Sequence, residues 1–353
     1  MKRLLVHPPP LLVEELAGRG LDLVVMVLGE MDPILAPRRV VLPLVPRAKV
    51  DLRAIGTLRR TIADHAPGIV HCFTPRGLST AVLATLGTRR PPPLVSFRGI
   101  ATPPSRLDPG AHLTFLSPRV RGHTCESQAV QAGLVAAGIP ADRCHVVYNC
   151  TTIDPAARLA RDAARDRLGL PHDAFVVGGT AAIRPVKRFD LLLRAAIDCL
   201  DLDGLTVALI GPVNDRAVCR LAADPRLAGR LVMPGWVADA GGLAAAFDLF
   251  VMPSRSEGLC RAVLEAMAAG VCPVVSDAGG MPELVRTQRD GVVFPSGDAA
   301  ALAGVIRRLH GDRTLLTRLA TAARERVERL CSPAALADRV LAAHDRFTPQ
   351  PAG

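Results

Sequence analysis

The sequence predicts an α/β fold with two Rossmann-like domains, each a parallel sheet covered by helices on both faces. Its 353 residues are enough for two domains of ordinary size. Hydrophobic residues make up 49% of the chain and charged residues 22%, which is typical of globular proteins and excludes a mainly disordered chain. Short apolar runs alternate with segments of helical period, and this alternation occurs twice along the chain.

The first half of the chain contains several apolar runs that are expected to form parallel strands. They are residues 3–7, 23–28, 40–45, 69–73, 94–97, 124–126 and 144–148. Helical periodicity is found between some of them, at residues 51–65, 77–86 and 127–137. The alternation weakens at residues 149–168, and we therefore expect an N-terminal domain of residues 1–160.

The second half repeats the pattern. Strands are expected at residues 176–180, 207–210, 231–233, 249–252, 273–276 and 292–294, with helices at 189–200, 241–246, 259–269 and 299–310. Residues 161–331 should form the C-terminal domain. Residues 314–347 have an amphipathic helical pattern, and the segment 332–353 is expected to form a helix that packs back toward the N-terminal domain. Because open α/β sheets bind ligands at the carboxyl ends of their strands, the predicted site is the cleft between the domains.

Positive charge is concentrated in the first part of the chain. Of the formal net charge of +10, residues 1–150 carry +8, from 18 Lys and Arg against 10 Asp and Glu. A region this basic favours an anionic partner, such as an acidic membrane surface or a phosphorylated substrate; a basic face that only aids solubility is the alternative. Aromatic residues make up only 3% of the chain, which argues against stacking on nucleic acid, and no nucleic-acid partner is expected.

The sequence also bears on location and cofactors. No apolar run approaches the ~18 residues that a membrane-spanning helix needs, and no apolar segment of an export signal precedes the first prolines. Nine cysteines are scattered without CxxC spacing, which favours reduced thiols over disulfides or a zinc site. We therefore expect a cytoplasmic protein, either free or peripheral on the inner face of the plasma membrane, with no metal and no cofactor.

The most informative stretch is residues 254–283, SRSEGLCRAVLEAMAAGVCPVVSDAGGMPE. Glu257 precedes a predicted helix, and Glu265 lies about two turns inside it. The amides of Gly258, Leu259 and Cys260 lie near the helix start, where free N–H groups and the helix dipole suit a diphosphate. One element could therefore offer carboxylates to a sugar and a ribose, and amides to phosphates. A capped surface helix with two solvated glutamates is the alternative.

The same stretch resembles the signature of the family-4 retaining glycosyltransferases of GT-B fold. Its EGxxxxxxEAMAxG and PVVxDxGGxPE patterns carry the resemblance. Similar motifs occur at residues 69–71, 74–75, 146–149, 178–180, 184–187, 209–212, 233–235, 290–291 and 298, so that the resemblance covers nearly the whole chain.

The resemblance implies roles for four charged side chains. Arg184 and Lys187 would hold the donor diphosphate and neutralise it as it leaves, which agrees with the phosphate chemistry of guanidinium and ammonium groups. Glu257 would contact the transferred sugar, and Glu265 the ribose hydroxyls. Two solvated cations at a helix start are the alternative for Arg184 and Lys187, although that position opposes the helix dipole.

Two further expectations concern the nucleotide base and metals. Gly235 and Trp236 follow a strand end and would lie near the base, although ordinary packing is the favoured alternative for Trp236. Members of this fold usually need no metal. The acidic pair at Asp201 and Asp203 is expected to be a solvated turn at the edge of the sheet away from the donor.

The first half departs from the family pattern. His7 and three prolines stand where a Gly-rich loop is usual, so the acceptor-side loop is rebuilt. Arg98 stands where an active-site histidine is usual; it cannot accept a proton, but it could bind a phosphate or a sugar hydroxyl. A structural ion pair is the alternative for Arg98. His71 is expected either beside the site or as a hydrogen-bonded core histidine.

The predicted function is therefore transfer of a sugar from a nucleotide-sugar donor, with retention of configuration, to a hydroxyl of a glycan or lipid-linked acceptor. Synthesis of cell-envelope polysaccharide or lipopolysaccharide is the expected context. Two alternatives remain: a non-catalytic GT-B module that binds a nucleotide or glycan and scaffolds a partner enzyme, and a nucleotide-sugar epimerase.

Overall fold

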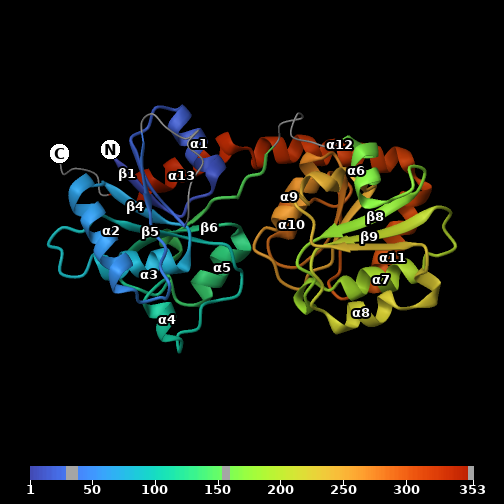
Figure 1. Cartoon of the computed structure of the whole chain (residues 1–353), viewed down its shortest axis with the longest axis horizontal. Helices are drawn as coiled ribbons and strands as arrows, with labels where there is room; N and C mark the ends of the chain where they lie inside the picture. Colours follow the sequence, from blue (N-terminus) through green and yellow to red (C-terminus); the bar gives the residue numbers. More distant parts are fainter. Residues whose placement is uncertain (29–38, 153–159, 349–353) are drawn as a thin grey trace. The chain divides into compact units, whose positions relative to one another are not determined.

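The computed structural model describes residues 1–28, 39–152 and 160–348 (Figure 1). The chain divides into two compact units. Unit 1 comprises Met1–Asn149 together with Pro333–Gly353, and unit 2 comprises Cys150–Ser332.

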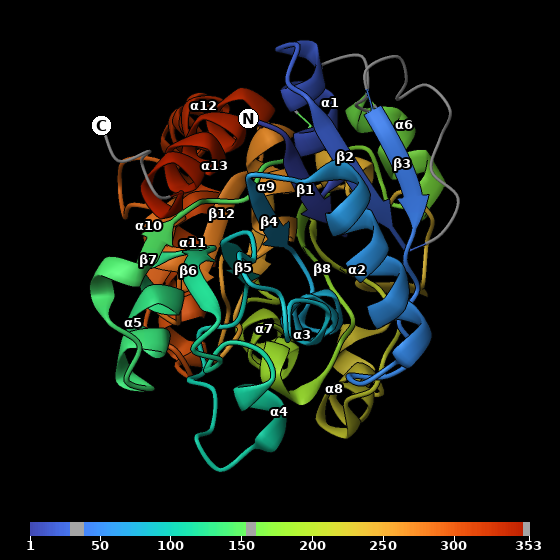
Figure 2. The same ribbon diagram turned by 90° about the vertical axis from the view of Figure 1, so that its left-hand side faces the viewer.

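Unit 1 is built on a parallel sheet in the order β3-β2-β1-β4-β5-β6-β7. Its strands follow this order from β3 to β7 across Figure 2. The order reverses between β1 and β4, which makes these two strands the topological switch point. The strands are β1 (Arg3–Val6), β2 (Leu23–Val27), β3 (Arg39–Pro43), β4 (Ile69–Cys72), β5 (Leu94–Arg98), β6 (Val120–Cys125) and β7 (Cys144–Val146).

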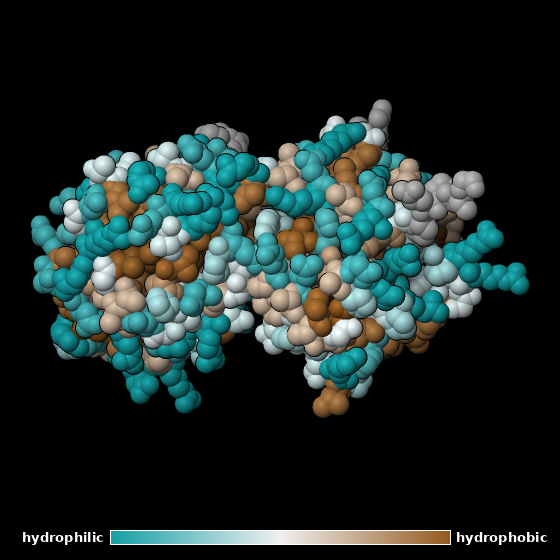
Figure 3. All heavy atoms as spheres, turned by 180° about the vertical axis from the view of Figure 1, so that it is seen from behind, coloured by the Kyte–Doolittle hydropathy of each residue, from teal (hydrophilic) through white to brown (hydrophobic). Residues whose placement is uncertain are grey.

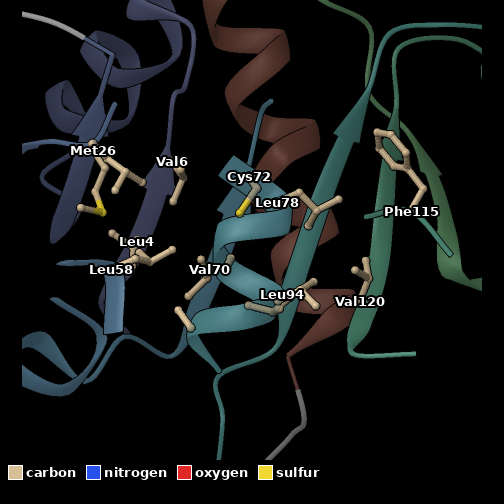
Figure 4. Close-up of a cluster of buried hydrophobic side chains, with 14 of the residues drawn as sticks. Leu4, Val6, Met26, Leu58, Val70, Cys72, Leu78, Leu94, Phe115 and Val120 are labelled. Atoms are coloured by element: carbon tan, nitrogen blue, oxygen red, sulfur yellow. The ribbon is translucent and has the colours of Figure 1, made fainter. Parts of the chain in front are cut away.

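Helices connect the strands of unit 1 and cover its sheet. They are α1 (Pro10–Gly18), α2 (Leu52–His65), α3 (Pro75–Ala84), α4 (Pro109–His112) and α5 (Gln128–Ala136). Capping side chains explain where three of these helices begin. The side chains of Asp51, Thr74 and Ser127 accept hydrogen bonds from the first amides of α2, α3 and α5. Apolar side chains such as Val6, Val70 and Leu78 fill the core beside the sheet (Figure 4).

The last helix of the chain belongs to unit 1. Helix α13 (Pro333–Phe347) contacts α1 and β6. The ring of Phe347 lies against Gly122 of β6, so closely that a Cβ at that glycine would come within 2.5 Å of it. This close approach explains a glycine inside a buried strand.

Unit 2 repeats the architecture with a parallel sheet in the order β10-β9-β8-β11-β12-β13. The switch point lies between β8 and β11. The strands are β8 (Phe175–Thr180), β9 (Leu205–Ile210), β10 (Leu231–Gly235), β11 (Leu249–Met252), β12 (Cys272–Ser276) and β13 (Val292–Phe294). Strand β8 carries two glycines near its end because the rings of Phe247 and Phe189 occupy the space of a side chain there.

The helices of unit 2 are α6 (Arg161–Leu168), α7 (Phe189–Ile197), α8 (Arg216–Ala222), α9 (Arg261–Ala268), α10 (Met281–Leu284), α11 (Ala299–Gly311) and α12 (Arg313–Leu330). Arg165 of α6 is fully buried and donates to three carbonyl oxygens and to the carboxylate of Asp248. The buried guanidinium therefore joins α6 to the start of β11 with its charge paired.

Helix α12 ends at Leu330 and α13 begins at Pro333, in agreement with the helix expected to start near residue 332. The segment predicted as a helix at 241–246 is a 3₁₀ turn, η6 (Gly242–Ala246). No helix within the described residues is both long and apolar enough to cross a bilayer. Polar side chains cover most of the face in Figure 3, with apolar atoms in scattered patches.

Candidate functional site

The candidate site in unit 2 lies at its switch point, where the loops after β8 and β11 leave the sheet on opposite sides. After β8, the 3₁₀ turn η4 (Pro185–Lys187) leads into α7. Arg188 closes the turn in the left-handed conformation, with φ of 55°, and its guanidinium pairs with Asp190 at 3.0 Å. The backbone amide of Lys187 donates to the carbonyl of Arg184, which fixes the two predicted cations on one turn.

The loop after β11 brings Glu257 to this turn. Lys187 Nζ lies 2.5 Å from Glu257 Oε1, and the two side chains are 16% and 11% exposed. The amide of Arg255 donates to the carbonyl of Val186, so backbone and side chains both join the two loops. An ammonium has three donors and only one is used here, so Lys187 can still bind an anion.

Arg184 is also available. Its side chain is exposed and makes no hydrogen bond or ion pair with any residue that the structure describes. A free guanidinium on the same turn as Lys187 is suited to a phosphate.

Two buried serines hold Glu257 and were missed by the sequence reasoning. Ser254 Oγ donates to Glu257 Oε1 at 2.7 Å, and Ser276 Oγ donates to the carbonyl of Ser254 at 2.5 Å. Both serines are 0% exposed. Ser276 ends β12, so the chain of hydrogen bonds runs from one strand to the next and then to the carboxylate. The signal that could have found Ser254 is its place three residues before Glu257, at the end of a buried strand.

The residues after Glu257 form a tight bend into α9. A Cβ on Gly279 would lie 2.0 Å from the carbonyl oxygen of Glu257, and φ at Gly279 is 60°, so only glycine fits there. Within the described chain, the amides of Gly258 and Leu259 donate to no other residue. They therefore remain free for an anion near the start of the helix.

Cys260 lies at the N-cap of α9 with φ of 69°. Its side chain is buried, and burial together with the charge of Glu257 raises the pKa of the thiol to about 12. The thiol is therefore neutral at ordinary pH, which leaves it without the reactivity of a nucleophile.

Glu265 lies inside α9, two turns beyond Glu257 along the chain. Burial raises the pKa of its carboxyl group, while Arg261, 3.3 Å away, opposes the shift. A Cβ on Gly241 would come within 3.0 Å of the carboxyl carbon, so a glycine here leaves room beside the carboxylate.

The end of β10 carries the residues predicted to lie near the base. Gly235 has φ of 75° with nothing within 4 Å of a Cβ built on it, and its carbonyl accepts from the amide of Gly211. Trp236 is 75% exposed, so it is not a core residue. At the end of β8, the Thr180 hydroxyl oxygen is buried and has no hydrogen-bond partner in the described chain. This hydroxyl was also missed by the sequence reasoning.

Arg98 belongs to unit 1, where it ends β5. It is 8% exposed, donates from Nε to the carbonyl of Ile100 and from Nη2 to that of Thr102, and lies 4.6 Å from the ring centre of Phe115. These contacts hold its own loop. A role for Arg98 toward a substrate stays a prediction.

His71 is a core histidine. It is 0% exposed, and its Nδ1 and Nε2 lie 3.1 Å from His344 Nε2 and 2.9 Å from Thr124 Oγ1. Burial holds its pKa well below the usual value. Both ring nitrogens are occupied, so of the two expectations for His71 the structure supports the hydrogen-bonded core.

All nine cysteines are free thiols, and Cys219 is the exposed one. No group of three or more His, Cys, Asp or Glu side chains in the described ranges gathers in the way a metal site requires. The absence of a metal requirement stays a prediction. Asp201 pairs with Arg307 at 2.6 Å on the surface, which accounts for one of the two acidic residues considered above.

Two Rossmann-like units, one with cations, a carboxylate and free amides at its switch point, define a class of nucleotide-dependent α/β proteins. The sequence model described as "Glycosyltransferase Family 4" matches residues 11–154, and the one described as "Glycosyl transferases group 1" matches residues 172–312. The chain belongs to this family of glycosyltransferases. The family predicted from the motifs is therefore confirmed.

Curated relatives fall in the same family. The chain is 31% identical over 232 residues to a D-inositol 3-phosphate glycosyltransferase of Catenulispora acidiphila, with 62% of this chain and 55% of the relative covered. It is 34% identical over 179 residues to the lipopolysaccharide core biosynthesis glycosyltransferase LpsE of Rhizobium meliloti, covering 50% and 52%. The chain thus spans about half the length of these curated relatives.

Solved structures share the fold. HepE of Anabaena in complex with UDP superposes with a TM-score of 0.79 at 21% identity, over 98% of this chain and 100% of that one. Sucrose-phosphate synthase of Thermosynechococcus elongatus gives a TM-score of 0.77 at 16% identity, over 98% and 99%. The predicted fold class, α/β with two Rossmann-like domains as in GT-B proteins, is confirmed.

Proposed function

We propose that the protein transfers a sugar from a nucleotide-sugar donor to a hydroxyl group of an acceptor, with retention of anomeric configuration. The Lys187–Glu257 pair at the switch point of unit 2 carries this proposal. It places a cation for a leaving diphosphate directly beside a carboxylate for a sugar. Both side chains lie on loops at the carboxyl edge of the sheet, where open α/β sheets bind their ligands.

Each part of the donor has a candidate partner in unit 2. The diphosphate would be bound by Lys187, Arg184 and the free amides of Gly258 and Leu259. Glu265 would accept hydrogen bonds from the ribose hydroxyls. Gly235 and Trp236, exposed at the end of β10, would lie along the base. Thr180, with its unpaired hydroxyl, adds a polar group at the same edge.

The chemistry proposed for this site needs no enzymic nucleophile. The acceptor oxygen would attack the anomeric carbon on the face from which the diphosphate departs, as the bond between that carbon and the diphosphate breaks. The proton of the acceptor hydroxyl would pass to the leaving diphosphate oxygen. Lys187 and Arg184 would stabilise the negative charge that develops there, so the protein contributes positioning and charge stabilisation.

The relatives support a donor and acceptor class. The solved HepE structure is a complex with UDP, and LpsE is named as a lipopolysaccharide core glycosyltransferase. We propose a UDP-sugar as the first donor to test, and a glycan or lipid-linked acceptor of the cell envelope. The basic first half of the chain suits an acidic acceptor or a peripheral position on an anionic membrane on its cytoplasmic side. Flotation with anionic vesicles tests the membrane position, and failure to float contradicts it.

The test of the function is a donor screen. UDP-, GDP- and ADP-sugars are incubated with the protein, with and without a pool of envelope glycans, and nucleotide release is measured. The proposal predicts release from one nucleotide series, stimulated by acceptor, with a product whose anomeric proton in NMR shows the configuration of the donor. An inverted product contradicts retention, and loss of all release in Lys187→Ala locates the activity in unit 2.

A non-catalytic module that binds a nucleotide or glycan is the second candidate. One observation favours it: the arginine that replaces the usual histidine, Arg98, uses Nε and Nη2 on carbonyl groups of its own loop. The donor screen separates the two functions, because a binding module would be stabilised by a nucleotide without releasing it from any sugar donor. An epimerase would return a donor with an altered sugar, which sugar analysis detects.

A further inference from the structure

A second polar site is formed in unit 1, at the amino-terminal edge of its sheet. A hollow of about 410 Å³ is lined by Arg121, Asp142, Arg143, Arg346 and Phe347. These residues come from β6, from the 3₁₀ turn η2 (Ala141–Arg143) and from the end of α13, and both η2 and α13 contact β6. We call this the basic hollow. Open α/β sheets bind their substrates at the carboxyl ends of the strands. The basic hollow lies at the opposite edge of the sheet.

The lining of the basic hollow has more cationic side chains than anionic ones. The guanidinium groups of Arg121 and Arg143 make no hydrogen bond or ion pair with any other described residue, although the backbone amide of Arg143 donates to the carbonyl of Pro140. Three guanidinium groups face a single carboxylate, that of Asp142. The positive charge of Arg143 also acts on the neighbouring His123: burial lowers the pKa of this histidine to about 4, and Arg143 contributes to the shift. Uncompensated cations that face one space favour an anion there.

Part of this arrangement is fixed by packing. Arg346 donates from Nε and Nη2 to the carbonyl oxygen of Asp142, at 3.2 Å and 3.0 Å, which ties the end of α13 to η2. Phe347 is 4% exposed, and its ring fills the space beside Gly122. The wall and one guanidinium are therefore held in place before any ligand binds, and preorganisation of this kind lowers the entropic cost of binding.

A second hollow, which we call the mixed hollow, adjoins the basic one. It has a volume of about 250 Å³ and an apolar wall that includes Phe115, Leu116, Pro118 and Ile139, while Arg106, His112 and His123 also line it. Arg143 lines both hollows. Arg143 thus lies between the basic hollow and a hollow with an apolar wall. This combination matches a molecule with a phosphate at one end and a hydrocarbon part at the other.

We propose that these two hollows together bind a phosphate-bearing amphiphile. The phosphate lies against Arg121, Arg143 and Arg346, and the hydrocarbon part lies against the apolar wall of the mixed hollow. Guanidinium groups suit this task because each can donate two parallel hydrogen bonds to phosphate oxygens. The site is independent of the proposed transfer reaction, because it is formed by unit 1 alone and at the opposite edge of that sheet from the carboxyl ends.

Calorimetry with the full chain tests the proposal. The probe is dihexanoyl phosphatidic acid, a soluble short-chain phospholipid, compared with inorganic phosphate and with dihexanoyl phosphatidylcholine, whose head group has no net charge. The variant is Arg143→Gln. The matched control is Arg89→Gln, which neutralises another exposed arginine of unit 1 that has no described partner. Thermal unfolding of both variants checks that each one folds.

The proposal predicts that phosphatidic acid binds at least about tenfold more tightly than inorganic phosphate or phosphatidylcholine. Arg143→Gln should weaken that binding by about tenfold, and Arg89→Gln should leave it unchanged. Added salt should weaken it in the wild type. Equal affinity for inorganic phosphate, or equal effects of the two substitutions, would overturn the proposal. Binding that persists in Arg143→Gln but is lost in Lys187→Ala would assign the phosphate to unit 2 and would also overturn it.

Discussion

The switch points of the two units differ in chemistry although the sheets share one topology. In unit 2, Lys187 and Glu257 face each other with unused hydrogen-bonding capacity. In unit 1, His7 follows β1 with φ of 56° and is 8% exposed. Its Nδ1 accepts from the Thr74 hydroxyl at 2.6 Å, and its Nε2 donates to the carbonyl of Leu44 at 2.8 Å.

A position at the switch point of a sheet does not by itself make a ligand-binding site. At the switch point of unit 1, both ring nitrogens are satisfied and Thr74 also caps α3. Such a group holds three loops together. At the switch point of unit 2, the charges are paired but not enclosed, and amides beside them are free. We therefore expect substitutions in unit 2 to affect ligand binding and turnover, and substitutions of His7 to affect folding.

The largest effect is expected for Lys187→Ala. Removal of the cation proposed to bind the diphosphate should lower transfer activity by ~10²- to 10³-fold, as loss of one charge-stabilising donor does in other enzymes. The melting temperature should fall, because Glu257 is only 11% exposed and loses its cation, but the protein should remain folded, since Ser254 still holds the carboxylate. Steady-state kinetics and thermal unfolding measure the two effects. Arg194→Ala removes an exposed guanidinium of α7 that lies 3.9 Å from Asp190; it is the control and should keep activity. A stable Lys187→Ala protein with full activity contradicts the assignment.

His7→Ala should destabilise the protein by about 2 kcal/mol at neutral pH, because a carbonyl and a hydroxyl lose their buried partner. Burial lowers the pKa of His7 in the folded state, so its contribution is present above the unfolded value of 6.5 and is lost as pH falls. The difference between wild type and variant should therefore shrink from pH 7 to pH 5. Urea denaturation at both pH values measures it. An equal difference at both would argue against the buried neutral ring.

Ser254→Ala tests whether the hydrogen bond to Glu257 contributes to turnover. Loss of the hydroxyl that holds Glu257 should lower kcat by about tenfold, because a hydrogen bond to a charged group contributes ~1.5–3 kcal/mol. Affinity for the nucleoside diphosphate should stay within about twofold, since Lys187 and the amides remain. Ser254→Thr keeps the hydroxyl and should recover part of the loss. A drop in diphosphate affinity equal to the drop in kcat would show a general disturbance of the loop instead.

The smallest effect concerns Glu265. Burial raises the pKa of this carboxyl in the folded protein above the usual 4.5. Its ionisation therefore costs stability as pH rises through that raised value. Glu265→Gln removes the cost, so the stability of the variant relative to wild type should increase from pH 4 to pH 7. Urea midpoints across this range give the answer, and a pH-independent difference would contradict the shift. Nucleotide affinity should fall in the same variant if Glu265 binds the ribose.

Much of the fold could be predicted from the sequence, because in most strands the pattern of apolar residues agrees with the burial of the strand in the structure. Parallel strands such as 249–252 are continuous apolar runs, and both faces of the sheet are covered. The first and last residues of the strands were harder to predict where local preference and tertiary packing compete. The strand expected at 124–126 begins at Val120 in the structure, because pairing with β5 extends over Val120, Gly122 and His123, with Arg121 at an irregularity of the register. The local sequence pattern does not indicate pairing of this kind between strands.

The site could be predicted only in part. Motif resemblance singled out Lys187 and Glu257, but their direct contact depends on how the loops after β8 and β11 pack, across 70 residues of sequence. Ser276 could not be predicted, because its partner is a backbone carbonyl in the loop that follows the neighbouring strand. The occupied N–H groups of Arg98 are likewise a product of the local fold of its own loop.

The most direct test of the account is calorimetric titration of UDP, GDP and ADP into wild type, Lys187→Ala and the control Arg194→Ala. The account predicts that one diphosphate binds the wild type and the control with the same affinity, and that Lys187→Ala weakens it by about tenfold or more without loss of folding. Absence of binding by every diphosphate, or equal affinity in Lys187→Ala, would contradict the claim that the switch point of unit 2 is a donor site.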